Sequence, residues 1–327
     1  MSSVSTLGDE EVFVEPLWRV ELRLSGLEQE LLKTWWVRRL GFVSHAGAAS
    51  ITTVQSYTRL EHSLGLLALV VHFAPDDREA RAAALLHDIG HLPFSHTFEH
   101  SIGLDHHVIG ADRIRDLAPL LSRHGIDPET VVGIVDGHVP SVLSGPRRGM
   151  RLDHLESFVR SGRAHGRTTV APHVTLSRLR LEGGAIDTDA ETAEYLRDLV
   201  VGEAQSQVAP RNLGPMAVMQ QLANSLLADP TARTSAEQLA AMTDDEFWAA
   251  VLSCPATRDL ALRLRTWPDL WSVTADEPAM SNGLKLWVRR LYLDLPLIGG
   301  HPSPPIDPAA HGLPHVPAQF AIVPITQ

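Results

Sequence analysis

Residues 83–100 read AALLHDIGHLPFSHTFEH, and this stretch decides how the rest of the chain is interpreted. Its alanine-rich beginning predicts a helix that ends at Gly90, which places His87 and Asp88 in the last turn. An adjacent imidazole and carboxylate offer a nitrogen and an oxygen donor to one point in space, and this pair suits a divalent transition metal. The stretch therefore predicts a pair of metal ligands at the end of a helix.

The His-Asp pair is weak evidence by itself, because such dipeptides usually cap a helix end or form surface hydrogen bonds. Two further segments strengthen it. His62 lies in RLEHSLGLLALVVHF (59–73), whose apolar character nearly all round predicts a buried helix. Asp153 lies in RLDHL (151–155), at the start of another predicted helix. Two histidines and two carboxylates leave coordination positions open for water or substrate, as a metal-dependent hydrolase requires.

The composition is that of an ordinary soluble globular protein, with 44% of the 327 residues hydrophobic and 20% charged. There is no run of about 18 uncharged apolar residues, and the first residues lack the pattern of a secretory signal, so we expect neither a membrane span nor secretion. The single cysteine, Cys254, excludes an intrachain disulfide and a thiolate zinc site and fits a reducing compartment. We therefore expect a cytoplasmic protein.

The net charge of −11 disfavours nucleic acid as a partner, because the overall field repels a polyanion. Small anions are compatible with this charge. Only Lys33 and Lys285 are lysines among the 28 basic residues, so phosphate recognition must depend on arginine and histidine. Eight of the 17 histidines lie between His62 and His107, which makes this region the candidate site.

Helical periodicity dominates the chain, so we expect a mainly α fold, a helical bundle with a minor β-hairpin and a small C-terminal β appendix. The hairpin is predicted in VTLSRLRLEGGAIDT (174–188), with its turn at Gly183–Gly184. Near the N-terminus, VFVEPLWRVELRL (12–24) predicts a pair of strands, and LEQELLKTWWVRRL (27–40) predicts one helix that Gly41 ends.

We expect three parts along the chain. Residues 1–10 form a polar tail, and residues 11–270 form the helical body, with its core at 55–165. Residues 271–327 form a small β appendix and a proline-rich tail, to which the sequence assigns no purpose.

RLEHSLG (59–65), AALLHDIGHLPFSHTFEH and RLDHL together resemble the HD-domain phosphohydrolases, closest to the branch that contains the deoxynucleoside-triphosphate triphosphohydrolases. The similarity runs from about residue 11 to about residue 265 and includes MTDDEFW (242–248). The resemblance implies an HD-domain helical bundle, a homo-oligomer and one divalent metal, either Mn, Fe, Co, Ni or Zn, or else Mg, with a second metal as an alternative. The implied metal ligands are His62, His87, Asp88 and Asp153.

The resemblance also implies roles for residues around these ligands. His91, His96 and Glu99 would be catalytic, with His96 protonating the leaving oxygen and Glu99 orienting it. Arg59 precedes His62 by one helical turn and faces either the same cleft or the surface. The resemblance places His106 and Arg160 at the substrate, and we add Arg59 by its spacing and Arg39 by its charge as predicted substrate-binding residues.

Departures from the branch bear on the substrate. After the last metal aspartate the branch has a lysine, a tyrosine, an arginine and an aspartate, where this chain has His154, Ser157, Arg160 and Ser161. Where the branch has a glutamine that reads the sugar, this chain has Arg39, a cation that suits phosphate. The substrate of the branch therefore cannot be assumed.

These residues predict a metal-dependent phosphohydrolase that uses metal-activated water on a phosphate ester or anhydride of a nucleotide or nucleotide-like small molecule. Two alternatives belong to other classes. One is a dinuclear-iron HD oxygenase, and His106 or His107 together with His138 would form such a two-metal centre. The other is a catalytically inactive, nucleotide-binding regulatory HD protein.

Overall fold

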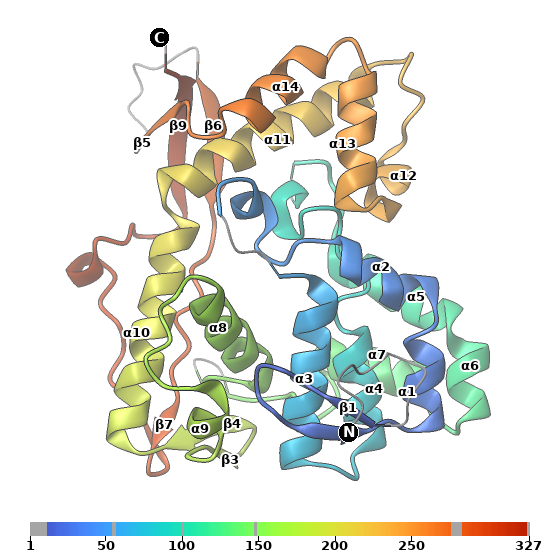
Figure 1. Cartoon of the computed structure of the whole chain (residues 1–327), viewed down its shortest axis with the longest axis vertical. Helices are drawn as coiled ribbons and strands as arrows, with labels where there is room; N and C mark the ends of the chain where they lie inside the picture. The colour runs from blue at the N-terminus through green and yellow to red at the C-terminus, as the bar shows by residue number, and fades with distance from the viewer. Residues whose placement is uncertain (1–11, 54–56, 100, 147–148, 276–282, 326–327) are drawn as a thin grey trace.

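The computed structural model describes residues 12–53, 57–99, 101–146, 149–275 and 283–325, and helices form most of its regular structure (Figure 1). The expected mainly α fold is confirmed, whereas the predicted polar tail, residues 1–10, lies outside the described residues. Within the described ranges, no helix is both long and apolar enough to cross a membrane.

The elements follow one another in a helical body that short strands interrupt. The α-helices are α1 (Gly26–Leu31), α2 (Trp35–Arg39), α3 (Arg59–Phe73), α4 (Arg78–Leu86), α5 (His106–Asp116), α6 (Ala118–Arg123), α7 (Pro128–Val135), α8 (Leu152–Ala164), α9 (Pro172–Leu176), α10 (Ala190–Gln207), α11 (Pro210–Ala228), α12 (Ala236–Ala241), α13 (Asp244–Ser253) and α14 (Arg258–Thr266). Short 3-10 helices are η1 (Leu40–Phe42), η2 (Gly47–Ile51), η3 (His96–Phe98) and η4 (Ala309–His311). The strands are β1 (Val12–Val14), β2 (Glu21–Arg23), β3 (Arg180–Glu182), β4 (Ala185–Thr188), β5 (Trp271–Ala275), β6 (Leu284–Val288), β7 (Leu297–Ile298), β8 (His301–Pro302) and β9 (Ala318–Pro324).

Two of the local predictions near the N-terminus have different outcomes. β1 and β2 form the expected antiparallel pair. The single helix expected over 27–40 is wrong, because the chain forms α1 and α2 with a break between them. At the break Thr34 has extended backbone (φ −74°, ψ 149°), and its hydroxyl donates to the Leu31 carbonyl (2.7 Å). A threonine that bonds to a nearby helix carbonyl thus interrupts the helix.

The hairpin expected over 174–188 is present as β3 and β4, with Gly183 and Gly184 at its turn. The beginning of that segment is helical instead, because Pro172 starts α9 at a position where a missing backbone N–H costs nothing.

α3 is buried on nearly all sides, as its apolar sequence predicts. Thr58 and Glu61 form a capping box at its start, and Leu66 and Leu67 are fully buried. The helix packs against both α4 and α8, and it stands between them in Figure 1. This packing brings the first turn of α3, the end of α4 and the first turn of α8 together.

α3 and α8 approach closely at Gly65. A methyl group at this position would overlap the Glu156 carboxylate and the Arg160 guanidinium, which form a buried ion pair on α8. The glycine therefore makes room for that ion pair between the helices.

The chain after residue 271 forms the expected β structure, but this structure is not a separate appendage. β5, β9 and β6 form an antiparallel sheet in that order, and its residues Trp271, Leu286 and Ile322 share a hydrophobic cluster with α11 and α13. Between β6 and β9 the chain runs back beside α10 (Figure 1), and β7 pairs in parallel with β4. The last part of the chain thus packs on several elements of the helical body.

Gly65→Ala is expected to lower the free energy of unfolding by about 3 kcal/mol or more, because the added methyl group separates a buried ion pair. Urea unfolding followed by circular dichroism measures the change. Gly110→Ala on α5 is the control, since its added carbon would lie 3.6 Å from Gly90, an ordinary contact. A Gly65 variant as stable as the Gly110 variant would contradict this account of the helix crossing.

Candidate metal centre

The four residues expected to bind metal lie together, although three different helices carry or precede them. His62 Nε2 on α3 lies 3.1 Å from His87 Nε2 at the end of α4 and 3.1 Å from Asp153 Oδ1 on α8. Asp88 Oδ1 lies 3.3 Å from His87 Nε2. Ligand atoms about 2.1 Å from one ion are about 3 Å apart. Among the described residues, His62, His87 and Asp153 offer donor atoms that all lie close enough to one another to hold one ion. Asp88 approaches two of these three, His87 and His62, so its place as a fourth ligand stays a prediction.

Both histidines are oriented by a bond at the other ring nitrogen. His62 Nδ1 lies 2.5 Å from Glu156 Oε2, and His87 Nδ1 lies 2.9 Å from the Ala84 carbonyl oxygen. Because an ionised carboxylate and a carbonyl only accept, each Nδ1 donates and each Nε2 is turned toward the other ligands. Such bonds fix the tautomer that a metal-binding imidazole needs.

The charges around His62 suit a cation. Burial disfavours charge on this imidazole, but the carboxylates of Glu156, Asp153 and Asp88 together raise its pKa to about 9. Three carboxylates around one ring therefore provide the negative potential that a divalent ion would compensate.

An ion-pair network holds Glu156 in place. Arg160 Nε lies 2.6 Å from Glu156 Oε1, and Arg160 Nη2 lies 2.7 Å from Glu15 Oε1, with both carboxylates buried. The charge of Arg160 is thus compensated within the protein. Arg160 also lines an open hollow of about 410 Å³ beside Tyr57, and its contact with substrate stays a prediction.

Arg59 faces the site and not the surface, since it is buried in the first turn of α3. Its Nη1 lies 2.9 Å from Asp88 Oδ2, and its Nε donates to Ser95 Oγ (2.8 Å). Burial raises the pKa of the Asp88 carboxyl, but the Arg59 guanidinium outweighs this effect and the pKa falls well below its usual range. Arg59 therefore keeps Asp88 ionised, and its own contact with substrate stays a prediction.

A second group of ionisable side chains lies beside the first. His96 Nδ1 and His106 Nδ1 lie 2.9 Å and 2.5 Å from the same oxygen, Glu99 Oε1. His91 Nε2 lies 3.4 Å from His96 Nε2. Burial raises the pKa of the Glu99 carboxyl, but the two imidazoles that donate to it hold this pKa well below its usual range. The structure thus brings together His91, His96, Glu99 and His106, with Glu99 in contact with His96 as expected.

Exposure differs across the two groups and defines an open side. The exposed fraction of the side chain is 1% for His62 and 4% for Asp88, but 39% for Asp153 and 45% for His96. Buried ligands form the base of the site, and accessible groups form its mouth. The accessible side of the candidate site is therefore the side of Asp153 and His96.

The loop that carries the second group has strained backbone. Phe94 and Ser95 both have positive φ, 53° and 56°. Asp244 Oδ1 accepts from the Phe94 N–H (2.6 Å) and Asp244 Oδ2 from the Ser44 N–H (2.8 Å). Ser95 Oγ donates to the Ser44 carbonyl (2.6 Å). Asp244, which lies in MTDDEFW, thus stabilises the backbone conformation of the loop that carries His96.

The expectation that Arg39 contacts substrate phosphate is wrong. Its side chain is fully buried, and its Nη1 donates to the His91 carbonyl (2.8 Å). Its remaining nitrogens donate to the carbonyls of Ala240, Ala241 and Met242. The last carbonyls of a helix have no partner within the helix, and Arg39 satisfies those of α12. Arg39 therefore ties α12 to the loop that carries His91.

The two-metal centre considered as an alternative, with His106 or His107 and His138, does not form in the described residues. His138 is exposed after α7, and in the described part of the chain it joins neither group of ligand-capable side chains. His91, His96, Glu99 and His106 do lie close enough to one another to hold an ion of their own.

Sequence reasoning misses three residues next to the metal ligands. Glu156 follows Asp153 by one helical turn, and this spacing is the signal that could have found it. The His45 ring lies 4.6 Å from the His62 ring and 4.9 Å from the Tyr57 ring. His45 and Tyr57 come from a segment without periodicity, so the sequence gives no signal for them.

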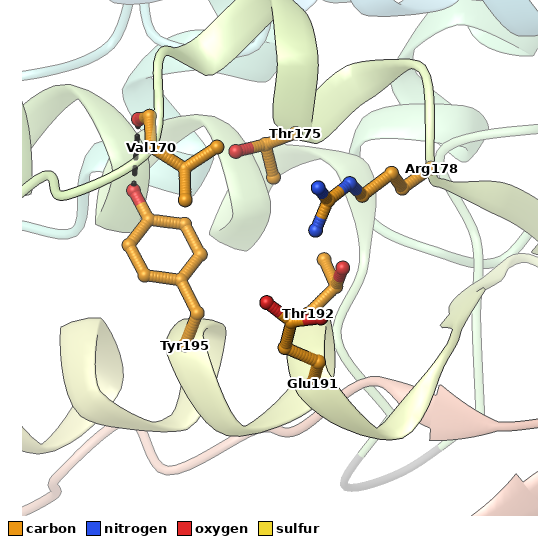
Figure 2. A pocket seen from close by; sticks show the side chains of 6 residues that line it. All are labelled: Val170, Thr175, Arg178, Glu191, Thr192 and Tyr195. Carbon is orange, nitrogen blue, oxygen red and sulfur yellow. Dashed lines mark hydrogen bonds between the residues drawn. The ribbon is translucent and has the colours of Figure 1, made fainter.

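A small pocket between α9 and α10 lies outside both groups (Figure 2). Figure 2 shows Arg178 and Glu191 directed toward the same space, with the Tyr195 hydroxyl bonded to the Val170 carbonyl (3.4 Å). None of the expected site residues lines this pocket, so it is not part of the candidate metal centre.

The fold and the site define a class of protein, a helical bundle that gathers two histidines and two aspartates at a point where three helices meet. Comparison with known families agrees with this class, because residues 59–158 match the family described as HD domain. The matched stretch contains all four candidate ligands. Residues 59–158 thus match an HD domain, and the described residues of this stretch include a His/Asp group able to hold a divalent metal.

The chain is also similar to individual curated proteins. The chain is 34% identical over 174 residues to the uncharacterized protein YwfO of Bacillus subtilis, a match that covers 46% of this chain and 40% of that protein. It is 28% identical over 172 residues to the metal-dependent phosphohydrolase cns2 of Cordyceps militaris, with 49% and 48% covered. The chain therefore spans less than half the length of either curated relative.

A solved structure, that of a phosphohydrolase from Bacteroides thetaiotaomicron, has the same fold. It aligns with a TM-score of 0.61 at 16% identity and covers 82% of this chain and 80% of that chain. Together the family match, the relatives and this fold support placement of the chain in the HD superfamily.

Asp153→Asn is expected to lower the bound divalent metal at least tenfold, because it weakens one of four converging donors. Mass spectrometry of metals in the purified, dialysed protein measures the content. His138→Ala, which changes an exposed histidine outside the group, is the control and should retain the wild-type content. Equal metal content in both variants would contradict the assigned ligand set.

Proposed function

We propose that the chain is a metal-dependent phosphohydrolase that acts on a nucleotide or nucleotide-like small molecule. The observation that carries the proposal is the convergence of His62, His87, Asp88 and Asp153 beside a histidine and glutamate group that opens to solvent. The HD-domain match, together with a relative whose name is metal-dependent phosphohydrolase, supports hydrolysis as the reaction class.

The protein's part in the proposed reaction is to present fixed donors. A divalent metal, when bound, supplies Lewis-acid polarisation of a phosphoryl oxygen and acidifies water. Glu156 and the Ala84 carbonyl hold the two imidazoles, and Arg59 holds Asp88. Groups that are already oriented need no rearrangement during the reaction, and this preorganisation lowers the barrier.

His96 is the proposed proton donor to the leaving oxygen. It is accessible, and its Nδ1 is engaged by Glu99. Its Nε2, which lies 3.4 Å from His91 Nε2, is the atom proposed to transfer the proton. We do not assign proton donation to His91, because burial together with the nearby Arg59 lowers its pKa well below the usual range and keeps it neutral.

The surroundings of the site favour an anionic small molecule as substrate. The open hollow lined by Tyr57, Glu61, Arg160 and Arg163 has a volume within the range of small-molecule sites, and we propose that it receives the organic part of the substrate. The positions of the branch's lysine and tyrosine hold His154 and Ser157. We therefore do not extend the proposal to a deoxynucleoside triphosphate as the specific substrate.

One observation favours the alternative of a dinuclear-iron oxygenase. His91, His96, Glu99 and His106 lie close enough together to hold a second ion. Such an enzyme would contain two iron ions per chain and would consume dioxygen. Metal analysis together with an oxygen electrode separates the two functions, since the phosphohydrolase needs one ion and no oxygen uptake.

The test of the proposed function is phosphorus-31 NMR of the manganese-loaded protein with a panel of ribonucleotides and deoxyribonucleotides that carry one, two or three phosphates. We expect at least one member to release orthophosphate, pyrophosphate or tripolyphosphate, and the Asp153→Ala variant to release none. Unchanged spectra across the whole panel would contradict nucleotide hydrolysis.

His96→Ala is expected to lower kcat by a factor of about 10² to 10⁴, because the reaction loses its proposed general acid while the metal ligands stay in place. KM and metal content should change little. Steady-state kinetics on the best substrate of the panel gives both constants. His107→Ala, an exposed neighbouring histidine, is the control, and an equal loss in the two variants would contradict the role of His96.

A further inference from the structure

A segment far outside the HD-domain match reaches the metal-bearing helix. The chain that follows β6 passes the start of α8, where the Leu295 carbonyl accepts from the Met150 N–H (2.8 Å). Asp294 Oδ2 lies 2.8 Å from Nδ1 of His154, the residue directly after the candidate ligand Asp153. These two contacts hold the C-terminal segment against the first turn of α8, next to the accessible ligand Asp153.

This segment places Tyr292 against the site. The Tyr292 ring meets the His154 ring edge to face, with 5.5 Å between the centroids. Burial raises the pKa of the phenol, the Arg290 guanidinium opposes this effect, and the carboxylates of Glu99 and Asp153 add to it. The phenol therefore lies within electrostatic range of both groups of ionisable side chains.

Tyr292 also holds an exposed cation. The Arg290 guanidinium lies over the Tyr292 ring, 4.6 Å from its centroid, and the rest of this side chain is exposed. On the other side of His154, Arg151 Nη2 lies 3.3 Å from His154 Nε2. Both arginines help to lower the pKa of the Asp294 carboxyl, but the carboxylate itself contacts His154. Within the described ranges, neither arginine has a carboxylate oxygen within ion-pair distance.

We propose that Arg290 binds a phosphate group of the substrate, with Tyr292 as the platform that orients it. The inference rests on the proposed function and deepens it, because it assigns the anion-binding side of the same site to the C-terminal segment. A planar guanidinium matches two phosphate oxygens, and stacking on an aromatic ring leaves its N–H groups free for them. The preferred substrates are therefore phosphomonoesters or polyphosphates with a terminal dianionic phosphate.

The test is isothermal titration calorimetry of inorganic phosphate into the metal-loaded, full-length protein. Arg290→Ala is compared with Arg289→Ala, because the two arginines are adjacent and both exposed. We expect the Kd for phosphate to rise about tenfold in Arg290→Ala, since a charge-assisted contact is lost, and to stay within about twofold in Arg289→Ala. Arg290→Lys should recover part of the affinity, because lysine keeps the charge but not the planar fork.

Several results would overturn the inference. They are the absence of phosphate binding to the wild-type protein, an unchanged Kd in Arg290→Ala, and an equal loss in the Arg289 variant, which would indicate only a general charge effect. Failure of the proposed function gives a different pattern. Phosphate binding that depends on Arg290, without hydrolysis of any nucleotide in the panel, would support the anion site and contradict the phosphohydrolase. Metal content and circular dichroism confirm that each variant is folded and loaded.

Discussion

The contact between His62 Nδ1 and Glu156 is the constraint on which the rest of the site depends. It joins α3 to α8 and turns His62 Nε2 toward His87 and Asp153. Burial of an imidazole or a carboxylate without a hydrogen-bonding partner costs free energy, so each of these two side chains stabilises the other in the core. Gly65 permits the close approach of α3 and α8. The same helix crossing therefore fixes the distance between the two backbones and the orientation of the His62 ring.

The second half of the site depends on contacts that are distant in sequence. The loop that carries His96 has two consecutive residues of positive φ, and such a conformation persists only where its surroundings determine it. Asp244 and Arg39 provide these surroundings, the first by accepting from backbone N–H groups and the second by donating to backbone carbonyls. The helices after residue 210 are therefore part of the support of the site, and the C-terminal segment extends this support to the start of α8 through Asp294.

The sequence predicts those features that local chemistry determines. The buried helix with His62, the helix end at His87 and the contact between Glu99 and His96 depend on spacing within a few turns, and the structure contains all three. The role of Arg39 is not predictable in this way, because its partners lie 52 positions away at His91 and about 200 positions away at the end of α12, and nothing in its own segment indicates them. The same holds for Asp294, which meets His154 only because the strand pairing of β7 returns the chain to α8.

The central claim is that one divalent cation binds between His62, His87, Asp88 and Asp153. Anomalous X-ray diffraction from crystals of the manganese-loaded protein, with data collected above and below the absorption edge of the metal, tests this claim directly. The account predicts a single strong anomalous peak between these four side chains, within about 2.0 to 2.3 Å of their donor atoms. A peak located among His91, His96, Glu99 and His106 alone, or no peak at either group, would contradict it.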